Sequence, residues 1–526
     1  MIKFNLGKKV FLNYLQKENN LFRLICCVFA LIATLCFYRY FSYLISISLF
    51  PYDWMPSDGD HLNFSHRIMQ GLAVYPNLDF SEVLNIYNPL YYVFVGLFGG
   101  ADVGMAFARS VSLVSWLACP IIVAAYYLKQ WSWPYALLAM VFILLPAEPY
   151  MLLDIVHVTP DSTMAFLFVC TMVVAQVVFK RQIVSKWELL LVGGLAALCF
   201  LTKQQGIIAI ASVVIYAIIN KKKLQDLFYL SLGFFVPFLL AVIYFEIINS
   251  ESFLQDTLFG LDRVMVVTPG LAEDRLLNFL THNLAFTLCV IVSFILISRR
   301  SIKLSIWHVS FALNFILLLK ILGNAGGGPN YFLTFWITMV VISVDIVVKF
   351  NRDATLFTLF HRTMKVNWSA PRLSRVLLTC FFINIIFGSV SILQQLNATV
   401  LPNKHLETVM QEYSSYVGEL MKSNPDARVL TNRNIGALVE HKVNVTNEGS
   451  TMFQYAWAHP ELFNQNKILT SISDKKYDFI FTGLQPYPVN VREEIDTSYK
   501  LAVTKELGVM QGNIGLVKIY VPKDNH

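Results

Sequence analysis

The chain has 526 residues, of which 56% are hydrophobic and only 14% are charged, and its mean hydropathy is +0.56. This composition excludes an ordinary soluble globular protein and predicts a polytopic membrane protein. The net charge of +7 does not indicate a nucleic-acid partner, because the excess lies in short loops between apolar runs and no basic patch carries interleaved aromatic residues.

Apolar runs long enough to cross a bilayer recur along most of the chain. The basic N-terminus precedes an apolar run that is too long for a signal-peptide core, so we expect a retained first span. An apolar piece at 89–100 is short for a span and is expected to lie in the interface or to re-enter the membrane. The candidate spans, about eleven in all, are 22–48, 103–127, 134–149, 161–179, 187–203, 206–220, 227–248, 284–298, 304–322, 331–349 and 373–393.

The basic loops predict the orientation of these spans. Lysine and arginine collect in 180–186, 221–223, 299–303 and 350–372, and an excess of these residues is typical of cytoplasmic loops. All four loops lie on the cytoplasmic face if the N-terminus is also cytoplasmic. The C-terminus is then extracytoplasmic.

The tail differs in composition from the rest of the chain. HLETVMQEYSSYVGELMK has helical apolar spacing, whereas ARVLTN, YDFIFTG, YKLAVTKEL and IGLVKIYV are short β-like runs separated by Gly, Pro and Asn. We therefore predict an α-helical polytopic membrane protein with two domains. Residues 1–399 form a transmembrane module with the outer loop 51–88, and residues 400–526 form a small α/β domain on the outer surface.

The loop after the first span carries two acidic residues, Asp58 and Asp60, ahead of an amphipathic stretch with His61 on its polar side. Aspartate before a first apolar turn is a favoured helix cap and suits the helix dipole. A carboxylate on the outer face could equally take part in chemistry. The two roles are compatible, and the residues alone leave both open.

A second polar interruption lies between two closely spaced spans. Lys203, Gln204 and Gln205 stand at the expected outer boundary, where positive charge is normally scarce. The lysine could extend its amine to the membrane surface. We favour the alternative, in which Lys203 binds an anionic group such as a phosphate.

Other polar residues fall on the same expected face. Asp154 and His157 would share a helical face, and Asp161 follows Pro160 at the start of a span, where capping is its simplest role. Lipid-facing charges are costly, so such residues are solvated or face a cavity. Tyr91 belongs to a tyrosine group that also fits an interfacial aromatic belt.

Two further outer segments could border a site. Loop 249–283 carries Arg263 and Arg275 and could cover a site or be an ordinary surface loop. A glycine run precedes Asn330 and Tyr331, where it could allow close backbone approach to a substrate or simply form a flexible turn.

The sequence lacks the GxSxG, HExxH, CxxC and Walker signatures. Any chemistry would therefore use carboxylates and bases. Asp58 and Asp60 alone provide too few oxygen atoms for a hard-cation site, so we expect no cofactor, although assistance by a divalent metal stays open.

In chain order, these features resemble the GT-C superfamily of integral-membrane glycosyltransferases, and most closely its protein mannosyltransferase and aminoarabinose transferase branch. The resemblance covers roughly residues 22 to 350. Relatives often carry Asp-Glu-Gly where this chain has Ser57-Asp58-Gly59, which makes Asp60 a competitor for the role of catalytic carboxylate. The motifs are Asp58-Gly59-Asp60 with Gly71 and Tyr75, Asn88-Pro89-Leu90-Tyr91-Tyr92, Pro160-Asp161, Thr202-Lys203-Gln204-Gln205-Gly206 and Gly328-Pro329-Asn330-Tyr331-Phe332.

This resemblance implies a bacterial inner-membrane enzyme that transfers a sugar from a polyprenyl-phosphate carrier to an envelope glycan, lipid or protein on the periplasmic side, with inversion. Asp58 or Asp60 would be the general base. The donor phosphate would be bound by Lys203, Arg263 and Arg275. The implied substrate-binding residues are His61, Tyr91, Asp154, His157, Asp161, Gln204, Gln205, Asn330 and Tyr331.

Three other functions are compatible with a polytopic chain. A secondary transporter or lipid-carrier flippase usually has charges near the midplane and repeat symmetry, whereas the charges here gather at one expected surface and no repeat is visible. A glycan polymerase or ligase with a diphosphate-linked donor would resemble enzymes that have a large loop rich in arginine and histidine, unlike loop 249–283. A membrane scaffold without activity is the remaining alternative.

Overall fold

The structure is a computed structural model. It describes residues 35, 37–54, 57–75, 85–100, 102–145, 151, 154–259, 268–324, 328–352, 379–384, 386–391, 394, 402–431, 436–443, 445–446, 465–483, 487–510 and 513–523.

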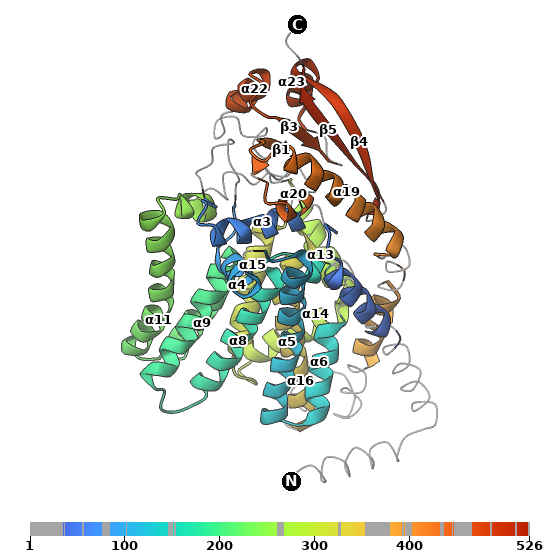
Figure 1. Cartoon of the computed structure of the whole chain (residues 1–526). Coiled ribbons are helices and arrows are strands. Elements are labelled where there is room, and N and C mark those ends of the chain that lie inside the picture. The colour runs from blue at the N-terminus through green and yellow to red at the C-terminus, as the bar shows by residue number, and fades with distance from the viewer. Residues whose placement is uncertain are drawn as a thin grey trace.

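A bundle of apolar helices forms most of the molecule (Figure 1). Neighbours along the chain pack against each other, as α5 does with α6 and α8, and α9 with α8 and α11. Residues 37–49 are helical as well. The elements of the bundle and its connections are α3 (Asp58–Met69), α4 (Leu90–Gly99), α5 (Met105–Gln130), α6 (Trp133–Leu144), η1 (Asp154–Val156), α8 (Asp161–Phe179), α9 (Lys186–Thr202), η2 (Gln204–Gly206), α10 (Ile207–Ile219), α11 (Leu224–Val242), η3 (Ile243–Ile248), η4 (Gln255–Phe259), α13 (Leu271–His282), α14 (Leu284–Ser298), α15 (Ile306–Ile321), η5 (Pro329–Phe332) and α16 (Leu333–Arg352).

Within the described ranges, four helices are long and apolar enough to span a membrane: Met105–Gln130, Asp161–Phe179, Leu224–Ile248 and Pro329–Phe350. The pair α13 and α14, bent by 95°, makes a fifth if it counts as one span. Several other predicted spans correspond to shorter apolar helices, such as α6, α10 and α15. The mostly helical membrane fold is therefore confirmed, whereas the number of eleven spans stays a prediction. The predicted spans 22–48 and 373–393 lie partly outside the described residues.

Local sequence explains where the helices begin and how closely they pack. Ser185 and Glu188 form a reciprocal capping box at the start of α9. Gly193 on α9 and Gly233 on α11 face each other so closely that an added Cβ on either would collide with the backbone of the other helix. These glycines let the two helices cross at backbone distance. Almost every residue of α16 from Leu333 to Phe350 is buried, so the other elements surround this helix.

The C-terminal part of the chain, from residue 402 onward, forms a five-stranded sheet with flanking helices, which we call the C-terminal unit. The strand order is β2-β1-β3-β5-β4, with β1 parallel to both β2 and β3, and with β5 antiparallel to both β3 and β4. Leu430 on β1 pairs with Ile480 on β3, which pairs with Tyr520 on β5. The elements are α19 (Lys404–Lys422), β1 (Val429–Thr431), α20 (Gly436–Glu440), β2 (Val445–Thr446), α22 (Gln465–Ser473), β3 (Phe479–Thr482), α23 (Val489–Ser498), β4 (Tyr499–Met510) and β5 (Asn513–Pro522).

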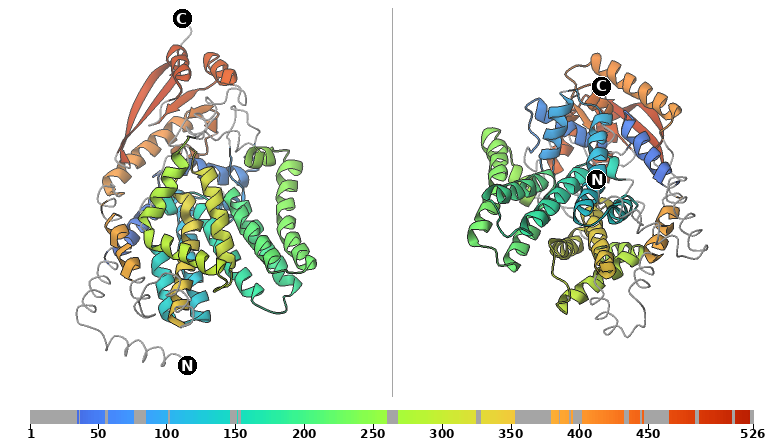
Figure 2. Two further views of the ribbon diagram at one scale, coloured as in Figure 1. Left: turned by 180° about the vertical axis from the view of Figure 1, so that it is seen from behind. Right: turned by 90° about the horizontal axis from the view of Figure 1, so that it is seen from below.

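The C-terminal unit sits on one end of the helical bundle, which we call the capped end (Figures 1 and 2). Helix α3 lies between the bundle and α20, and the two helices pack on each other. One buried apolar cluster runs without a break from the membrane helices into α19, α20 and the sheet, as Trp336, Val417 and Leu438 show. The placement of a domain boundary at residue 400 stays a prediction.

Candidate functional site

Asp58 is the first residue of α3 and is fully buried at the capped end. Its Oδ1 accepts a hydrogen bond of 2.8 Å from the backbone N–H of Val158, and its Oδ2 accepts one of 3.3 Å from that of Trp54. The Nδ1 atom of His157 lies 3.8 Å from Oδ2. Asp58 therefore joins its own loop to the segment at 157–158, which is about a hundred residues away in the sequence.

Arg109 forms an ion pair with Asp58. Its Nη2 lies 2.5 Å from Asp58 Oδ2 and also donates to the carbonyl of Tyr52, while Nη1 donates to the carbonyl of Phe50. Burial alone would raise the pKa of Asp58, but Arg109 and His157 outweigh it and hold this pKa well below its usual range. Arg109 and His157 therefore favour the ionised form of the Asp58 carboxyl group.

Lys203 and Asp161 form a second buried pair. The chain leaves α9 at Lys203 in an extended conformation, and α8 begins at Asp161. The Lys203 Nζ lies 2.6 Å from Asp161 Oδ1, and both side chains are 4% exposed or less. Gly206 makes this turn possible, because an added Cβ there would collide with the carbonyl of Cys199.

Two aromatic rings complete the surroundings of Lys203. Its Nζ lies 5.3 Å from the ring centre of Tyr87 and 4.7 Å from that of Tyr331, within the range of cation–π attraction. The ion pair and the two rings hold the charge of Lys203 at one point. A desolvated, fixed cation of this kind interacts more strongly with an anion than a surface lysine does.

His61 lies between the two ion pairs. Its ring stacks on Tyr92 at 5.8 Å, its Nδ1 lies 2.7 Å from the Tyr92 hydroxyl, and its ring centre is 5.3 Å from that of Tyr87. Burial lowers the pKa of His61 to about 4, against the raising effect of Asp58 and Asp161. His61 is therefore neutral near pH 7.

Helix α13 and the short helix η5 border the same place through Arg275, Phe279 and Tyr331. Arg275 on α13 donates from Nη1 to the carbonyls of Leu322 and Asn324, each at 2.9 Å. These bonds hold the end of α15 and Asn324 against α13. In η5, the Tyr331 ring faces Lys203. Phe279 on α13 stacks on Phe332 at 4.2 Å and so holds α13 against η5.

The structure thus brings together Asp58, His61, His157, Asp161, Lys203 and Tyr331, and Arg275 lies on α13, whose Phe279 packs against η5. Other predicted residues have contacts within the protein. The Tyr91 hydroxyl meets the Ala108 carbonyl and Ser112 Oγ, and Gln204 donates to the carbonyls of Ile86 and Thr257. Asp60, Gln205 and Asn330 are half-buried. Arg263 and the side chain of Asp154 lie outside the described residues.

Sequence reasoning missed three residues of this site. Arg109 is a lone arginine inside an apolar span, and an intramembrane charge is by itself a signal of function. Tyr87 lies beside Lys203, although the sequence analysis favoured Tyr91 among the neighbouring tyrosines. Asp53 is buried and carries no local sequence signal, because only the folded chain brings its partner close.

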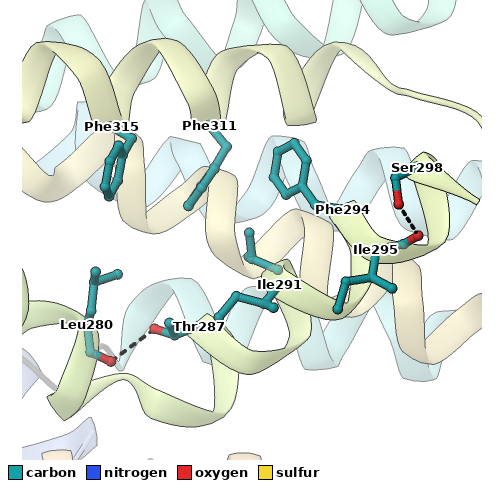
Figure 3. Close-up of a pocket in the computed structure, with 9 residues that line it drawn as sticks. Leu280, Thr287, Ile291, Phe294, Ile295, Ser298, Phe311 and Phe315 are labelled. Carbon is teal, nitrogen blue, oxygen red and sulfur yellow. Dashed lines mark hydrogen bonds between the residues drawn. The ribbon is translucent and has the colours of Figure 1, made fainter. Parts of the chain in front are cut away.

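No group of three or more His, Cys, Asp or Glu side chains in the described part of the chain could hold a metal ion. A separate cavity of about 490 Å³ lies between α13, α14 and α15 (Figure 3). It is almost entirely apolar, and Leu280, Phe294, Phe311 and Phe315 line it. Helix α13 carries both Leu280 of this cavity and Arg275 of the site.

No protein-family model and no curated protein sequence matches this chain. Solved structures do match. ArnT from Cupriavidus metallidurans, solved with undecaprenyl phosphate, superposes with a TM-score of 0.55 and 11% identity over 94% of this chain and 97% of its own. The oligosaccharyltransferase AglB from Archaeoglobus fulgidus, solved with an inhibitory peptide and a dolichol-phosphate, superposes with a TM-score of 0.51 and 10% identity. The match covers 94% of this chain and 74% of AglB. The arabinofuranosyltransferase AftD from Mycobacteria superposes with a TM-score of 0.51 and 10% identity. The match covers 94% of this chain and 40% of AftD.

These neighbours are GT-C glycosyltransferases. At 10 to 11% identity the similarity establishes the fold. The chain therefore has the GT-C fold over nearly its whole length. The resemblance that the sequence motifs indicated is confirmed at this level.

Proposed function

We propose that this protein is a membrane glycosyltransferase that takes a sugar from a polyprenyl-phosphate carrier and transfers it to a cell-envelope acceptor on the extracytoplasmic side of the bacterial inner membrane. The observation that carries this proposal is the meeting of a fixed carboxylate, Asp58, and a fixed amine, Lys203, at the capped end of a GT-C fold. The neighbours with undecaprenyl phosphate and dolichol-phosphate support a lipid-phosphate donor.

The sidedness follows from where the basic loops lie. Helices α8 and α9 run from Asp161 to the loop 180–186 and back to Lys203, so this loop is at the end opposite the site. Helix α10 begins close to Lys203 and ends just before Lys221, Lys222 and Lys223, so these lysines also lie at the end opposite the site. The basic loops thus lie at the end of the bundle opposite the capped end, and an excess of lysine and arginine is typical of the cytoplasmic face. The site then faces the periplasm, where lipid-linked sugars meet envelope acceptors.

In the proposed reaction, an acceptor hydroxyl oxygen forms a bond to the anomeric carbon of the sugar. The bond between that carbon and the phosphate oxygen breaks, and its electron pair leaves with the polyprenyl phosphate. The hydroxyl proton passes to an aspartate, with Asp58 the first candidate and Asp60 the second. Although Asp58 is a weak base, the hydroxyl becomes strongly acidic as its oxygen bonds to carbon. Attack opposite the leaving group inverts the anomeric configuration.

Lys203 would stabilise the negative charge that grows on the leaving phosphate, which is most effective in a site that excludes water. A phosphate oxygen would compete with Asp161 for the Lys203 ammonium group. His61 is neutral near pH 7 and so adds no positive charge. Arg263 remains a proposed donor-phosphate ligand, and Asp154, His157, Gln204, Gln205 and Asn330 remain proposed substrate contacts. The apolar cavity beside α13 would take part of the hydrocarbon tail.

The test is a comparison of envelope glycans by mass spectrometry in a deletion strain complemented with variants. We expect the deletion strain to lose one sugar residue, wild type to restore it, and Asp58→Asn to fail at equal membrane abundance. Asp474→Asn, on the exposed surface of the C-terminal unit, is the matched control and should restore the sugar. Restoration by both Asp58→Asn and Asp60→Asn would remove the base assignment.

A second measurement separates the donor classes. Purified protein in lipid nanodiscs is given sugars on polyprenyl monophosphate or on polyprenyl diphosphate, and the released lipid phosphate is measured. Release from the monophosphate donor supports the proposal. Release from the diphosphate donor alone indicates a polymerase or ligase, and uptake into vesicles without release indicates a transporter.

A further inference from the structure

A buried carboxylate joins the C-terminal unit to the loop that carries Asp58. Asp53 is 2% exposed, and its Oδ2 accepts a hydrogen bond of 2.8 Å from the backbone N–H of Gly436, which is 383 residues away in the sequence. Gly436 is the first residue of α20. The next residue, Trp54, donates its backbone N–H to Asp58 Oδ2. Asp53 therefore bonds to the start of α20 and is adjacent in the chain to a residue that bonds to Asp58.

Gly436 allows this close approach because it has no side chain. An added Cβ would lie 2.6 Å from Asp53 Oδ2 and 2.8 Å from its Cγ, closer than a real Cβ approaches another atom. Any larger residue would push the Asp53 carboxylate away from the amide. The contact thus depends on a specific residue on each side of the interface.

The segment around Asp53 also sets the position of Asp58. The carbonyls of Phe50 and Tyr52, on either side of residue 51, accept from Arg109, and the N–H of Trp54 donates to Asp58 Oδ2. Moving Asp53 would therefore move Trp54 and the carbonyls that orient Arg109. Two of the partners of Asp58 Oδ2, the Trp54 N–H and Arg109, therefore belong to, or are fixed by, residues 50–54.

We propose that Asp53 is a positioning residue, which ties α20 of the C-terminal unit to segment 50–59 and thereby holds Asp58 in its working orientation. Docking of the C-terminal unit then has a direct effect on the carboxylate of the site. Any link to catalysis rests on the function proposed above. The structural coupling does not, because it can be measured without turnover.

The experiment is hydrogen–deuterium exchange of the purified full-length protein in nanodiscs, followed in peptides that cover 57–63 and 436–440. Removing the acceptor leaves the partly buried N–H of Gly436 unsatisfied, which should raise exchange about tenfold. We expect this rise in both peptides for Asp53→Ala and, from the opposite side of the contact, for Gly436→Ala. Asp53→Asn keeps an acceptor oxygen and should exchange more slowly than Asp53→Ala.

Lys442→Ala is the matched control. It breaks an exposed ion pair between the C-terminal unit and Asp102, which contributes little to docking, and should change exchange by less than about twofold. Any of three results would overturn the proposal: a rise confined to 436–440, no rise in either peptide, or equal exchange in Asp53→Ala and Asp53→Asn. Coupled exchange in a protein without transferase activity would contradict the proposed function and leave the positioning role intact.

Discussion

Replacing Lys203 by methionine is the perturbation that the structure predicts most sharply. Methionine keeps an unbranched side chain of similar length, so packing changes little while the charge is removed. Asp161 then remains as a buried carboxylate without its cation, since the two side chains are 2.6 Å apart and 4% exposed or less. Breaking a buried ion pair on one side typically costs roughly 3–5 kcal/mol.

The expected loss therefore lies near the upper end of single-residue effects. The contacts of Lys203 Nζ with Tyr87 and Tyr331 add up to about 2 kcal/mol each if they are fully desolvated. Neutralising the partner as well should reverse most of the cost, because a buried pair replaced on both sides is often close to neutral in stability. The double variant Lys203→Met with Asp161→Asn is thus expected to be more stable than Lys203→Met alone.

The stability of each variant is measured as the midpoint temperature of thermal unfolding in detergent. Transfer activity is measured on the same preparations. Lys442→Met, an exposed lysine, controls for the loss of a positive charge. The double variant should recover stability and remain inactive, because it still lacks Lys203, the residue proposed to bind the phosphate. The reasoning is refuted if Lys203→Met is as stable as wild type, or if the double variant recovers activity together with stability.

Three other outcomes follow from individual contacts. Burial and the nearby Asp58 raise the pKa of Asp53 from 3.8 to about 7, with the Gly436 amide and Arg109 acting in the opposite sense, so the contribution of Asp53 to stability should fall by at most about 4 kcal/mol as pH rises between these values; the difference in thermal midpoint between Asp53→Asn and wild type, measured from pH 4 to 8, should show this fall. Burial lowers the pKa of His61 from 6.5 to about 4, so the contribution of His61 runs the other way and is lost as pH falls through that interval; the difference between His61→Phe and wild type should show this loss. Gly193→Ala should force α9 from α11 and lower stability by about 1–3 kcal/mol in denaturant titration.

The sequence predicted the helices better than it predicted their lengths. The span 161–179 coincides with α8, and 284–298 coincides with α14, because each is an unbroken apolar run between polar residues. The bend of 95° between α13 and α14 was not predictable, since it depends on how Phe279 packs on Phe332.

The site was predictable where charge interrupts an apolar run. Asp58, Asp161 and Lys203 stand out in this way, and all three meet at the capped end. The sequence could not show which of Tyr87 and Tyr91 contacts Lys203, because neighbouring tyrosines have the same local pattern. The fold places the Tyr87 ring beside Lys203. The role of Asp53 was not predictable for a different reason, since its partner is a backbone amide 383 residues away, which no local sequence pattern indicates.

The most direct test of the central claim is an experimental structure of the protein with undecaprenyl phosphate. We expect the phosphate to lie within hydrogen-bonding distance of the Lys203 Nζ, between Tyr87 and Tyr331, with the Asp58 carboxylate facing the space beyond it. A phosphate bound at the opposite end of the bundle, or bound unchanged in position and affinity by Lys203→Met, would contradict it.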